Sequence, residues 1–296
     1  MDIAALQAFV AVADLGSFSA AADRLYVTQP AVSKRIANLE TLMSARLFDR
    51  IGRQVLLTEA GRTLYPRAHR VLTEIEDGRR DLHNLSGRVE GTLRVATSHH
   101  VGLHRLPPVL RRYRARFPQV RLDLRFMASE AAYGAVTEGS VDFAVVTLDP
   151  TPRPELSASP LWTDPMLPVA ARKSPLLNRH CVRPADLEAE PAILPDSKTF
   201  TRRIVDNALA GLGIKPNVEL STNFLETIKM MVSVGLGWSV LPVNMIDREL
   251  AVIELPGLEI ARPLGAIHHP GRTLSNAARA MLTLLPEDEA DARPPA

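Results

Sequence analysis

The stretch GSFSAAADRLYVTQPAVSK, residues 16–34, sets the architecture of the amino-terminal part of the chain. Its consecutive alanines predict a short, closely packed helix over 20–25, and a link of two residues follows. Thr28 is a favourable N-cap for the next helix, and Pro30 falls in its first turn, where the missing N–H costs nothing. Two helices joined by so short a link predict a helix-turn-helix.

The helix that begins after Thr28 has an apolar face and a polar face. Val32, Ile36 and Leu39 recur at helical spacing and predict the buried side. The polar side carries Gln29, Pro30, Ser33 and Lys34. A glutamine can bond an adenine edge twice, a serine bonds base edges more weakly, and a lysine reaches phosphate. The alternative is an ordinary face that meets only water.

The local charge favours a nucleic acid over that alternative. Residues 24–70 hold nine basic and three acidic residues, whereas residues 1–23 hold three acidic residues and no lysine or arginine. An excess of six positive charges on so short a segment favours a polyanionic partner, because neutralised phosphates release counterions.

Outward from this helix, LFDRIGRQVLLTEAG over 47–61 predicts a hairpin that turns at Gly52. Arg50 and Arg53 flank the turn, where they can contact the DNA backbone or the minor groove. Their alternative role is a surface salt bridge of little energetic consequence.

About seventy amino-terminal residues carry motifs that occur together in a known family. The motifs are Leu6-Gln7-Ala8-Phe9, Gly16 to Ala22, Thr28-Gln29-Pro30-Ala31-Val32-Ser33, Leu39-Glu40, Leu47-Phe48-Asp49-Arg50 and Thr58-Glu59-Ala60-Gly61. Together they resemble the winged helix-turn-helix domain of LysR-type transcriptional regulators. The resemblance implies that six residues contact DNA: Gln29, Pro30, Ser33, Lys34, Arg50 and Arg53.

A single long helix is predicted from Thr58 to about Ser86, followed by a stop at Gly87. Apolar and small residues recur along it at alternating spacings of four and three, at Leu64, Ala68, Val71, Ile75, Gly78, Leu82 and Leu85. This heptad pattern predicts a dimeric coiled coil rather than a helix packed only on its own domain. We therefore expect three parts: a DNA-binding domain at 1–58, a linker and dimerisation helix at 59–88, and an effector-binding domain at 89–296.

The carboxy-terminal part alternates between strand-like and helix-like segments. Strands are predicted at 92–97, 121–126, 142–147, 166–171, 218–220, 238–241, 251–255 and 262–267. Helices are predicted at 100–116, 130–138, 201–211, 223–234 and 273–285. This alternation predicts an α/β fold with parallel layers.

Hydroxyl-rich corners follow several of these strands and precede helices, where α/β folds place their ligands. The candidate effector-binding residues at these corners are Thr97, Ser98, His99, His100, Thr147, Thr199, Thr201, Thr222 and Asn223. Each corner alone fits ordinary helix capping, whereas their recurrence favours a common cleft for a small polar or anionic ligand.

The same region resembles the effector domain of LysR-type regulators, notably at Thr222-Asn223, Glu226 to Lys229 and Gly235 to Pro242. The resemblance implies a two-subdomain fold like that of periplasmic solute-binding proteins, with subdomain I at 89–163 and 267–296, subdomain II at 164–266, and two crossing strands. Positions 97–100 and 147 are similar to ligand-contacting threonines in the sulfur-metabolism branch, from which His99 and His100 depart.

The histidines allow a different hypothesis, because His100 and His104 lie four residues apart on a predicted helix, next to His99. A metal site would need a further ligand at a defined spacing, and the sequence shows none, so we expect neither metal nor cofactor. The motifs G-x-S-x-G, H-E-x-x-H, G-x-x-x-x-G-K-[ST] and G-x-G-x-x-G are also missing, so no enzyme is predicted. A metal- or anion-sensing protein, or an enzyme with a DNA-targeting arm, remains the alternative.

The composition restricts the cellular location and the partners that we expect. Of 296 residues 46% are apolar, and no run is long and apolar enough for a membrane span, so no membrane partner is expected. Cys181 is the single cysteine, which excludes an internal disulfide and agrees with a cytoplasmic location. We expect four partners: double-stranded DNA with an inverted repeat, a small-molecule effector, further copies of the chain in a dimer or tetramer, and RNA polymerase.

Overall fold

The computed structural model describes residues 2–51, 54–179 and 181–286. Its contacts divide the chain into two compact units, residues 1–86 and 87–296. The predicted linker helix thus belongs to the first unit. Within the described ranges, none of the helices combines the length and the apolar character needed to cross a bilayer.

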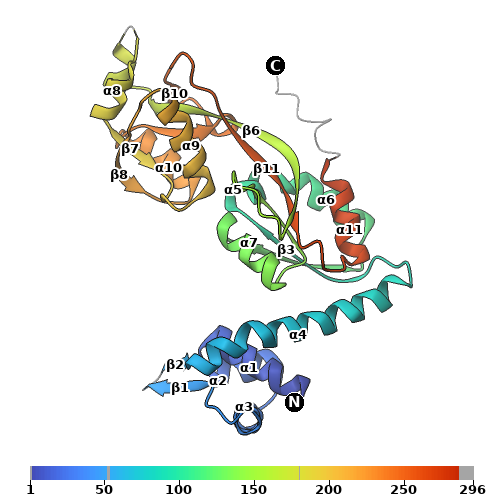
Figure 1. The fold of residues 1–296 in the computed structure, drawn as a ribbon. Coiled ribbons are helices and arrows are strands. Elements are labelled where there is room, and N and C mark those ends of the chain that lie inside the picture. Colours follow the sequence, from blue (N-terminus) through green and yellow to red (C-terminus); the bar gives the residue numbers. More distant parts are fainter. Residues whose placement is uncertain (1, 52–53, 180, 287–296) are drawn as a thin grey trace. The chain divides into compact units, whose positions relative to one another are not determined.

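The first unit contains a helix-turn-helix followed by a hairpin and a long helix (Figure 1). Its elements are α1 (Ile3–Leu15), α2 (Phe18–Leu25), α3 (Gln29–Met43), β1 (Phe48–Ile51), β2 (Gln54–Leu57) and α4 (Glu59–Asn84). The side chain of Ser17 caps α2, which begins two residues earlier than predicted. Thr28 is extended before α3, but its side chain makes no capping hydrogen bond, so that part of the prediction was wrong.

The hairpin is packed onto the helices by aromatic rings. Phe48 of β1 lies 5.4 Å from Phe9 and 5.8 Å from Phe18, measured between ring centroids. Glu40 of α3 accepts a hydrogen bond from the backbone N–H of Leu47 at 2.7 Å. These contacts fix the hairpin relative to α3.

Helix α4 starts beside the hairpin. The hydroxyl of Thr58 accepts from the N–H of Gly61 at 3.0 Å and donates to the carbonyl of Arg46 at 2.6 Å. A Cβ at Gly61 would lie 2.2 Å from the carbonyl oxygen of Leu47, so only glycine allows this close approach.

The predicted heptad seam of α4 divides into two parts. Ala68 is buried in the core of the first unit, and Leu64 packs against that core. Val71, Leu82 and Leu85 are 41%, 72% and 84% exposed. The distal seam is thus an uncovered row of apolar side chains on the single chain.

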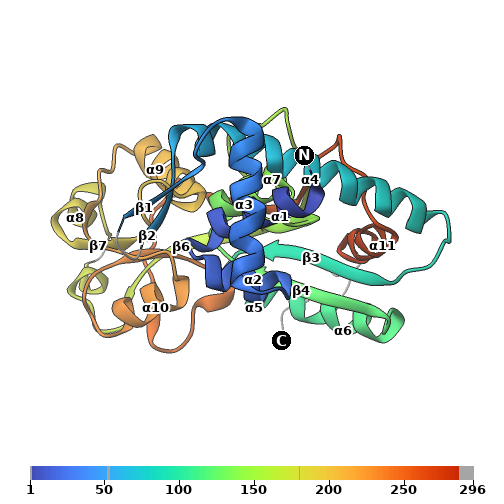
Figure 2. The same cartoon turned by 90° about the horizontal axis from the view of Figure 1, so that it is seen from below.

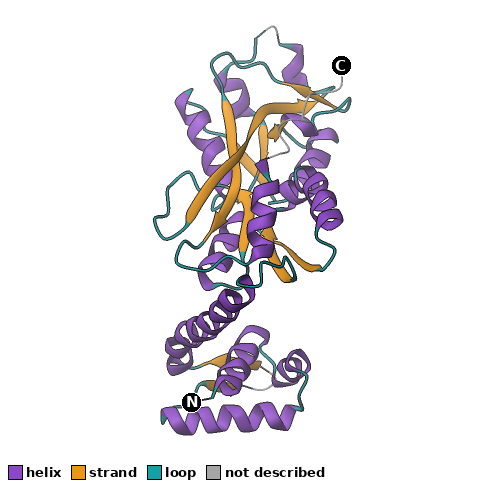
Figure 3. Cartoon of the chain, turned by 90° about the vertical axis from the view of Figure 1, so that its right-hand side faces the viewer, coloured by secondary structure: helices purple, strands orange, loops and turns teal. Residues whose placement is uncertain are grey.

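The second unit is built on a seven-stranded mixed sheet flanked by helices (Figure 3). Its strands are β3 (Gly91–Thr97), β4 (Val120–Phe126), β5 (Phe143–Thr147), β6 (Ser157–Ala171), β9 (Ser239–Pro242), β10 (Leu250–Val252) and β11 (Ile260–His268). The order is β10-β6-β11-β5-β3-β4, and β9 also pairs with β6. A separate parallel pair joins β7 (Pro191–Leu194) to β8 (Asn217–Ser221).

Two long strands connect the halves of this unit. Strands β6 and β11 pair antiparallel from Ser157 to Met166, and they run from the half with β3, β4 and β5 to the half with β7 and β8 (Figure 1). The first half carries α5 (His99–His104), α6 (Leu106–Arg116), α7 (Ser129–Glu138) and α11 (Asn276–Leu284). The second carries α8 (Pro184–Ala189), α9 (Phe200–Gly211), α10 (Leu225–Ser233) and the 3-10 turns Pro175–Asn178 and Val243–Met245. The subdomain boundaries at 163/164 and 266/267 fall within β6 and β11 and stay a prediction.

Several predicted elements of this unit need correction. The sheet is mixed rather than parallel, since β6, β9, β10 and β11 pair antiparallel. The helix predicted at 100–116 is two helices that meet at Arg105, because Pro107 and Pro108 have no N–H to continue the hydrogen-bond ladder. Strand β6 is far longer than the predicted 166–171 and contains Pro160 and Pro165, and β7, which begins at Pro191, was not predicted; proline is uncommon inside strands.

Candidate DNA-reading helix and effector cleft

The polar face of α3 is uncovered within its unit. Gln29, Pro30 and Lys34 are exposed and Ser33 is half-buried, whereas Val32, Ile36 and Leu39 are buried as predicted. Figure 2 looks onto α3, which lies in front of α1 and α2 along its length.

Two of the predicted DNA-contacting side chains are joined to each other. The amide nitrogen of Gln29 donates to the hydroxyl of Ser33 at 3.0 Å, one helical turn away. This bond aligns both side chains on the exposed face and leaves the Gln29 carbonyl oxygen and the Ser33 hydroxyl hydrogen for base edges. Lys34 lies beside them with its ammonium in solvent.

The hairpin prediction is met in part. β1 and β2 pair antiparallel, with Arg50 opposite Val55. The backbone of Arg50 is described, its side chain is not, and Arg53 lies outside the described residues. Their predicted contacts with DNA therefore remain predictions.

A cavity of about 280 Å³ lies between the two halves of the second unit. Seven of the nine predicted effector residues line it: Ser98, His99, His100, Thr147, Thr199, Thr201 and Asn223. Thr97 and Thr222 do not. Thr97 is fully buried and donates to the carbonyl of Val145 at 2.8 Å, which ties β3 to β5.

Some hydroxyl and amide groups that line the cavity already make hydrogen bonds within the protein, and others do not. Thr199 caps α9 by accepting from the N–H of Arg202, and it donates to the carbonyl of Asp196. Asn223 accepts from the N–H of Asp196 at 3.0 Å. Ser98 precedes α5 without a side-chain capping bond, so its hydroxyl is available to a ligand.

The start of α7 lies beside the cavity, and Ala128 is its N-cap residue. Ser129 is the first residue of the helix rather than its cap, and its hydroxyl accepts from the N–H of Thr147 at 3.2 Å. Glu130 accepts from the N–H of Phe200, which joins α7 to the start of α9 across the cleft.

The sequence did not predict a charged pair that lies beside this cavity. Arg262 of β11 and Asp164 of β6 are 3% and 1% exposed, and the guanidinium donates to Asp164 at 2.6 Å and 3.2 Å. A further guanidinium nitrogen of Arg262 lies 3.3 Å from the hydroxyl of Thr201 and lines the cavity. Arg105 contacts the other Asp164 oxygen at 3.4 Å. Neither strand end carried a motif, so only the pairing of β6 with β11 reveals the group.

His100 lies against this pair and is 4% exposed. Its Nε2 is 3.7 Å from the Asp164 carboxylate, and within the described part of the chain neither ring nitrogen has a hydrogen-bond partner. Burial, followed by the nearby Arg262, lowers the pKa of His100 to about 3. The imidazole is therefore neutral at physiological pH.

Aromatic rings form the mouth of the cavity. The exposed ring of His99 lies edge-on to Phe126 at 5.7 Å and to Phe224 at 5.3 Å between centroids. Phe126 and Phe224 are about half exposed and line the cavity, so they offer apolar surface to a ligand.

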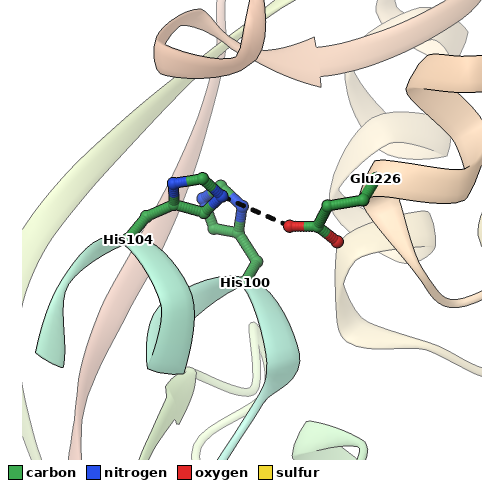
Figure 4. A group of neighbouring side chains, drawn as sticks. All are labelled: His100, His104 and Glu226. Atoms are coloured by element: carbon green, nitrogen blue, oxygen red, sulfur yellow. Dashed lines mark hydrogen bonds and ion pairs between the residues drawn. The ribbon is translucent and has the colours of Figure 1, made fainter. Parts of the chain in front are cut away.

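His104, at the end of α5, faces α10. Its Nε2 lies 3.2 Å from a carboxylate oxygen of Glu226, and His100 is adjacent (Figure 4). Among the described residues, His100, His104 and Glu226 form the group of histidines and carboxylates that could hold a metal ion. Glu226 is the further candidate ligand that sequence spacing did not reveal.

A larger hollow of about 750 Å³ lies elsewhere, along Ala171 to Leu176 and Ser233 to Trp238. None of the predicted effector residues lines it, and the smaller cavity holds the convergent polar groups.

Comparisons with known proteins agree with this geometry. Residues 3–62 match the family described as "Bacterial regulatory helix-turn-helix protein, lysR family", and residues 86–290 match the LysR substrate binding domain. The chain belongs to the LysR family. This LysR-type protein is a transcriptional regulator with a helix-turn-helix DNA-binding domain and an effector-binding domain, not an enzyme.

Relatives of this LysR-type regulator cover both units. It is 32% identical over 287 residues to a "Probable RuBisCO transcriptional regulator" of Cyanophora paradoxa, spanning 93% of this chain and 88% of that one. It is 66% identical over 108 residues to an HTH-type transcriptional regulator from the ibpB-leuC intergenic region of Azotobacter vinelandii, spanning 36% of this chain and 75% of that one.

Solved structures show the same fold. A full-length OxyR variant of Pseudomonas aeruginosa superposes with a TM-score of 0.71 at 21% identity, covering 97% of this chain and 98% of that one. CbnR complexed with its target DNA superposes with a TM-score of 0.65 at 21% identity, with the same coverages. The predicted winged helix-turn-helix and two-part effector domain are confirmed as the fold.

Proposed function

We propose that this LysR-type regulator reads an inverted repeat in duplex DNA through the exposed face of α3, once from each subunit of a dimer or tetramer. Gln29, Pro30, Ser33 and Lys34 supply the contacts from α3, and Arg50 and Arg53 supply those from the hairpin. The observation that carries this proposal is the hydrogen-bonded Gln29–Ser33 pair, held outward on a helix whose other face is buried.

The double variant Gln29→Ala/Ser33→Ala tests the reading of bases. It should lose about 1–3 kcal/mol of discrimination between a selected duplex and a scrambled one, because the base contacts are lost while the phosphate contacts stay. Fluorescence anisotropy on both duplexes measures this difference. Gln119→Ala, an exposed glutamine outside the first unit, is the matched control and should bind as the parent does. Unchanged sequence preference in the double variant would count against α3.

Self-association is supported by the distal part of α4 and the turn after it. Leu82 in the helix and Leu85 just beyond its end remain largely exposed on the single chain and continue the heptad spacing. A two-fold pair of chains also supplies the second half-site that one helix-turn-helix cannot read. Sedimentation of Leu82→Glu should shift the protein toward monomer.

The effector we propose is a small metabolite that carries an acceptor oxygen, such as a carboxylate, and an apolar part. Arg262 and Thr201 offer donors at the base of the cavity, Ser98 offers a free hydroxyl, and Phe126 and Phe224 offer apolar surface. Differential affinity for two arrangements of the domain would then alter DNA binding or the contact with RNA polymerase. The setting we propose is the cytoplasm.

Thermal-shift screening of the full chain tests the cleft. The probes are small mono- and dicarboxylates, aromatic carboxylates, inorganic sulfate and phosphate. A true ligand raises the melting temperature with the logarithm of its concentration, and the effect should be lost in Ser98→Ala/Thr201→Val while DNA binding is retained. Loss of the shift in Gln119→Ala as well would contradict the assignment to this cavity.

A further inference from the structure

One side-chain cluster at the cleft joins His100, which lines the cavity, to two residues that the proposed effector site does not use, His104 and Glu226. His100 and His104 lie one turn apart on α5, and Glu226 lies in the first turn of α10, 122 residues beyond His104 in the chain (Figure 4). The first two residues come from one half of the effector unit and the third comes from the other half.

The geometry of the cluster matches metal coordination. The candidate ligand atoms of all three residues lie within 4.8 Å of one another, and His104 Nε2 is 3.2 Å from Glu226 Oε1. Zinc bonds of about 2.0–2.2 Å in a tetrahedron place neighbouring ligand atoms roughly 3.3 Å apart. Histidines at positions i and i+4 of a helix are a recurring zinc-binding pair.

Lone pairs of the cluster are buried without partners. Neither ring nitrogen of His100 has a hydrogen-bond partner in the described part of the chain, and the same holds for the second carboxylate oxygen of Glu226. Buried polar atoms in native proteins nearly always have a partner, so orphaned atoms that converge on one point need an explanation. A bound cation would supply a partner for one ring nitrogen of His100 and for the carboxylate of Glu226.

The nearby positive charges are already neutralised in part. Arg262 and Arg105 both contact the buried carboxylate of Asp164, at 2.6 Å and 3.4 Å. The carboxylate of Glu226 lies 3.2 Å from Nε2 of His104 and also interacts electrostatically with Arg262. Its negative charge thus acts both on the imidazole of His104 and on the charge that Arg262 retains.

We propose that His100, His104 and Glu226 bind one divalent transition-metal ion, which pins α5 to α10 across the mouth of the effector cleft. Two imidazole nitrogens and one carboxylate oxygen suit zinc, cobalt, nickel or copper, whereas magnesium and calcium prefer sites made only of oxygen. Three protein ligands leave a fourth position open to water or to a ligand oxygen. The site goes beyond the proposed function, since metal binding requires neither DNA nor an identified effector.

Titration of the metal-free full chain with Co²⁺ tests the site, with Zn²⁺ as the competitor. The background variant is Cys181→Ser, because the exposed thiol of Cys181 can itself bind these ions. We expect one Co²⁺ per chain with the visible absorption of a four-coordinate ion, displaced by one equivalent of Zn²⁺. Zn²⁺ should also raise the melting temperature with the logarithm of its concentration.

His104→Ala and Glu226→Gln should each weaken binding by at least about a hundredfold, since the loss of groups that only orient a ligand already costs about 10–100-fold. Glu226→Gln keeps an oxygen that can accept a hydrogen bond from His104. If Glu226 only held His104 in place, this variant would therefore bind Co²⁺ as tightly as the background does. Glu219→Gln and His269→Ala, outside the cluster, are the matched controls and should bind as the background does. Absence of Co²⁺ absorption at equimolar metal, or equal losses in the controls, would overturn the proposal.

Discussion

The reading face of α3 and the effector cleft place polar groups in opposite physical settings. The α3 face is formed by Gln29, Pro30, Ser33 and Lys34 of one helix, and three of these four side chains are exposed. The cleft is assembled from residues between Ser98 and Arg262 on several elements, around a buried ion pair. The first can change without disturbing the core beneath it, whereas the second is part of the core.

Because of this difference, side chains on the α3 face should contribute to DNA binding, whereas the buried charges of the cleft should contribute to the stability of the fold. A solvated side chain on α3 contributes free energy only when DNA is present, because water replaces its partner in the free protein. A buried charge in the cleft contributes to folding at all times, because its removal leaves a partner without compensation. Substitutions in the two regions should therefore affect different measurements.

The largest effect is expected for Arg262→Met. This variant leaves Asp164 buried with only the longer contacts to Arg105 and to the neutral His100, so the free energy of unfolding should fall by about 3–5 kcal/mol. Urea unfolding followed by tryptophan fluorescence measures it, because Trp162 and Trp238 are both buried in the effector unit. The double variant Asp164→Leu/Arg262→Met should recover most of the loss. A single variant as stable as the parent would show that the pair is not part of the core.

A steric change in the first unit ranks next. Gly61→Ala places a Cβ against the carbonyl of Leu47, and we expect a loss of about 1–3 kcal/mol confined to residues 1–86. Hydrogen exchange resolved by peptide measures the two units separately. Gly78→Ala is the control on the same helix, because its Cβ meets nothing within 4 Å, and it should stabilise α4 by about 0.5–1 kcal/mol. An equal loss of protection against hydrogen exchange in both units would show that the two units do not unfold independently.

A charge change on the reading face should affect only binding. Lys34→Ala should weaken the binding of selected and scrambled duplexes alike and reduce the salt dependence of binding by about one charge, because the contact proposed for this lysine is with phosphate. The melting temperature should stay the same, since Lys34 is exposed. A change in sequence preference would instead place Lys34 at a base edge.

A small effect on stability is expected in the cleft itself, at a hydroxyl that makes no helix-capping bond. Ser98→Ala should change the free energy of unfolding by no more than about 0.5 kcal/mol, because the Ser98 side chain makes no capping bond. Thr199→Ala should cost about 1 kcal/mol, since its hydroxyl caps α9. Urea unfolding of the two variants under the same conditions distinguishes a ligand-facing hydroxyl from a structural one.

The same contrast explains what the sequence could and could not reveal. The residues of α3 are neighbours in the chain, so helical spacing alone places Gln29 and Ser33 together on one face. Strand-to-helix corners are also local, and therefore most of the predicted cleft residues do line the cavity.

The groups that the sequence could not reveal depend on long-range pairing. Arg262 meets Asp164, 98 residues away, only because β11 pairs antiparallel with β6. Glu226 meets His104 only because α10 and α5 face each other across the cleft. No local sequence pattern predicts either contact. The strand β6, which brings Asp164 to Arg262, contains prolines, and prolines are uncommon inside strands.

The most direct test of the central claim is the affinity of the full chain for an in vitro selected inverted-repeat duplex and for its scrambled counterpart, measured by anisotropy over a range of salt concentrations. The account predicts at least about a thousandfold preference for the selected duplex, with both affinities falling linearly with salt on logarithmic axes. Equal affinity for the two duplexes, or no binding even at low salt, would contradict it.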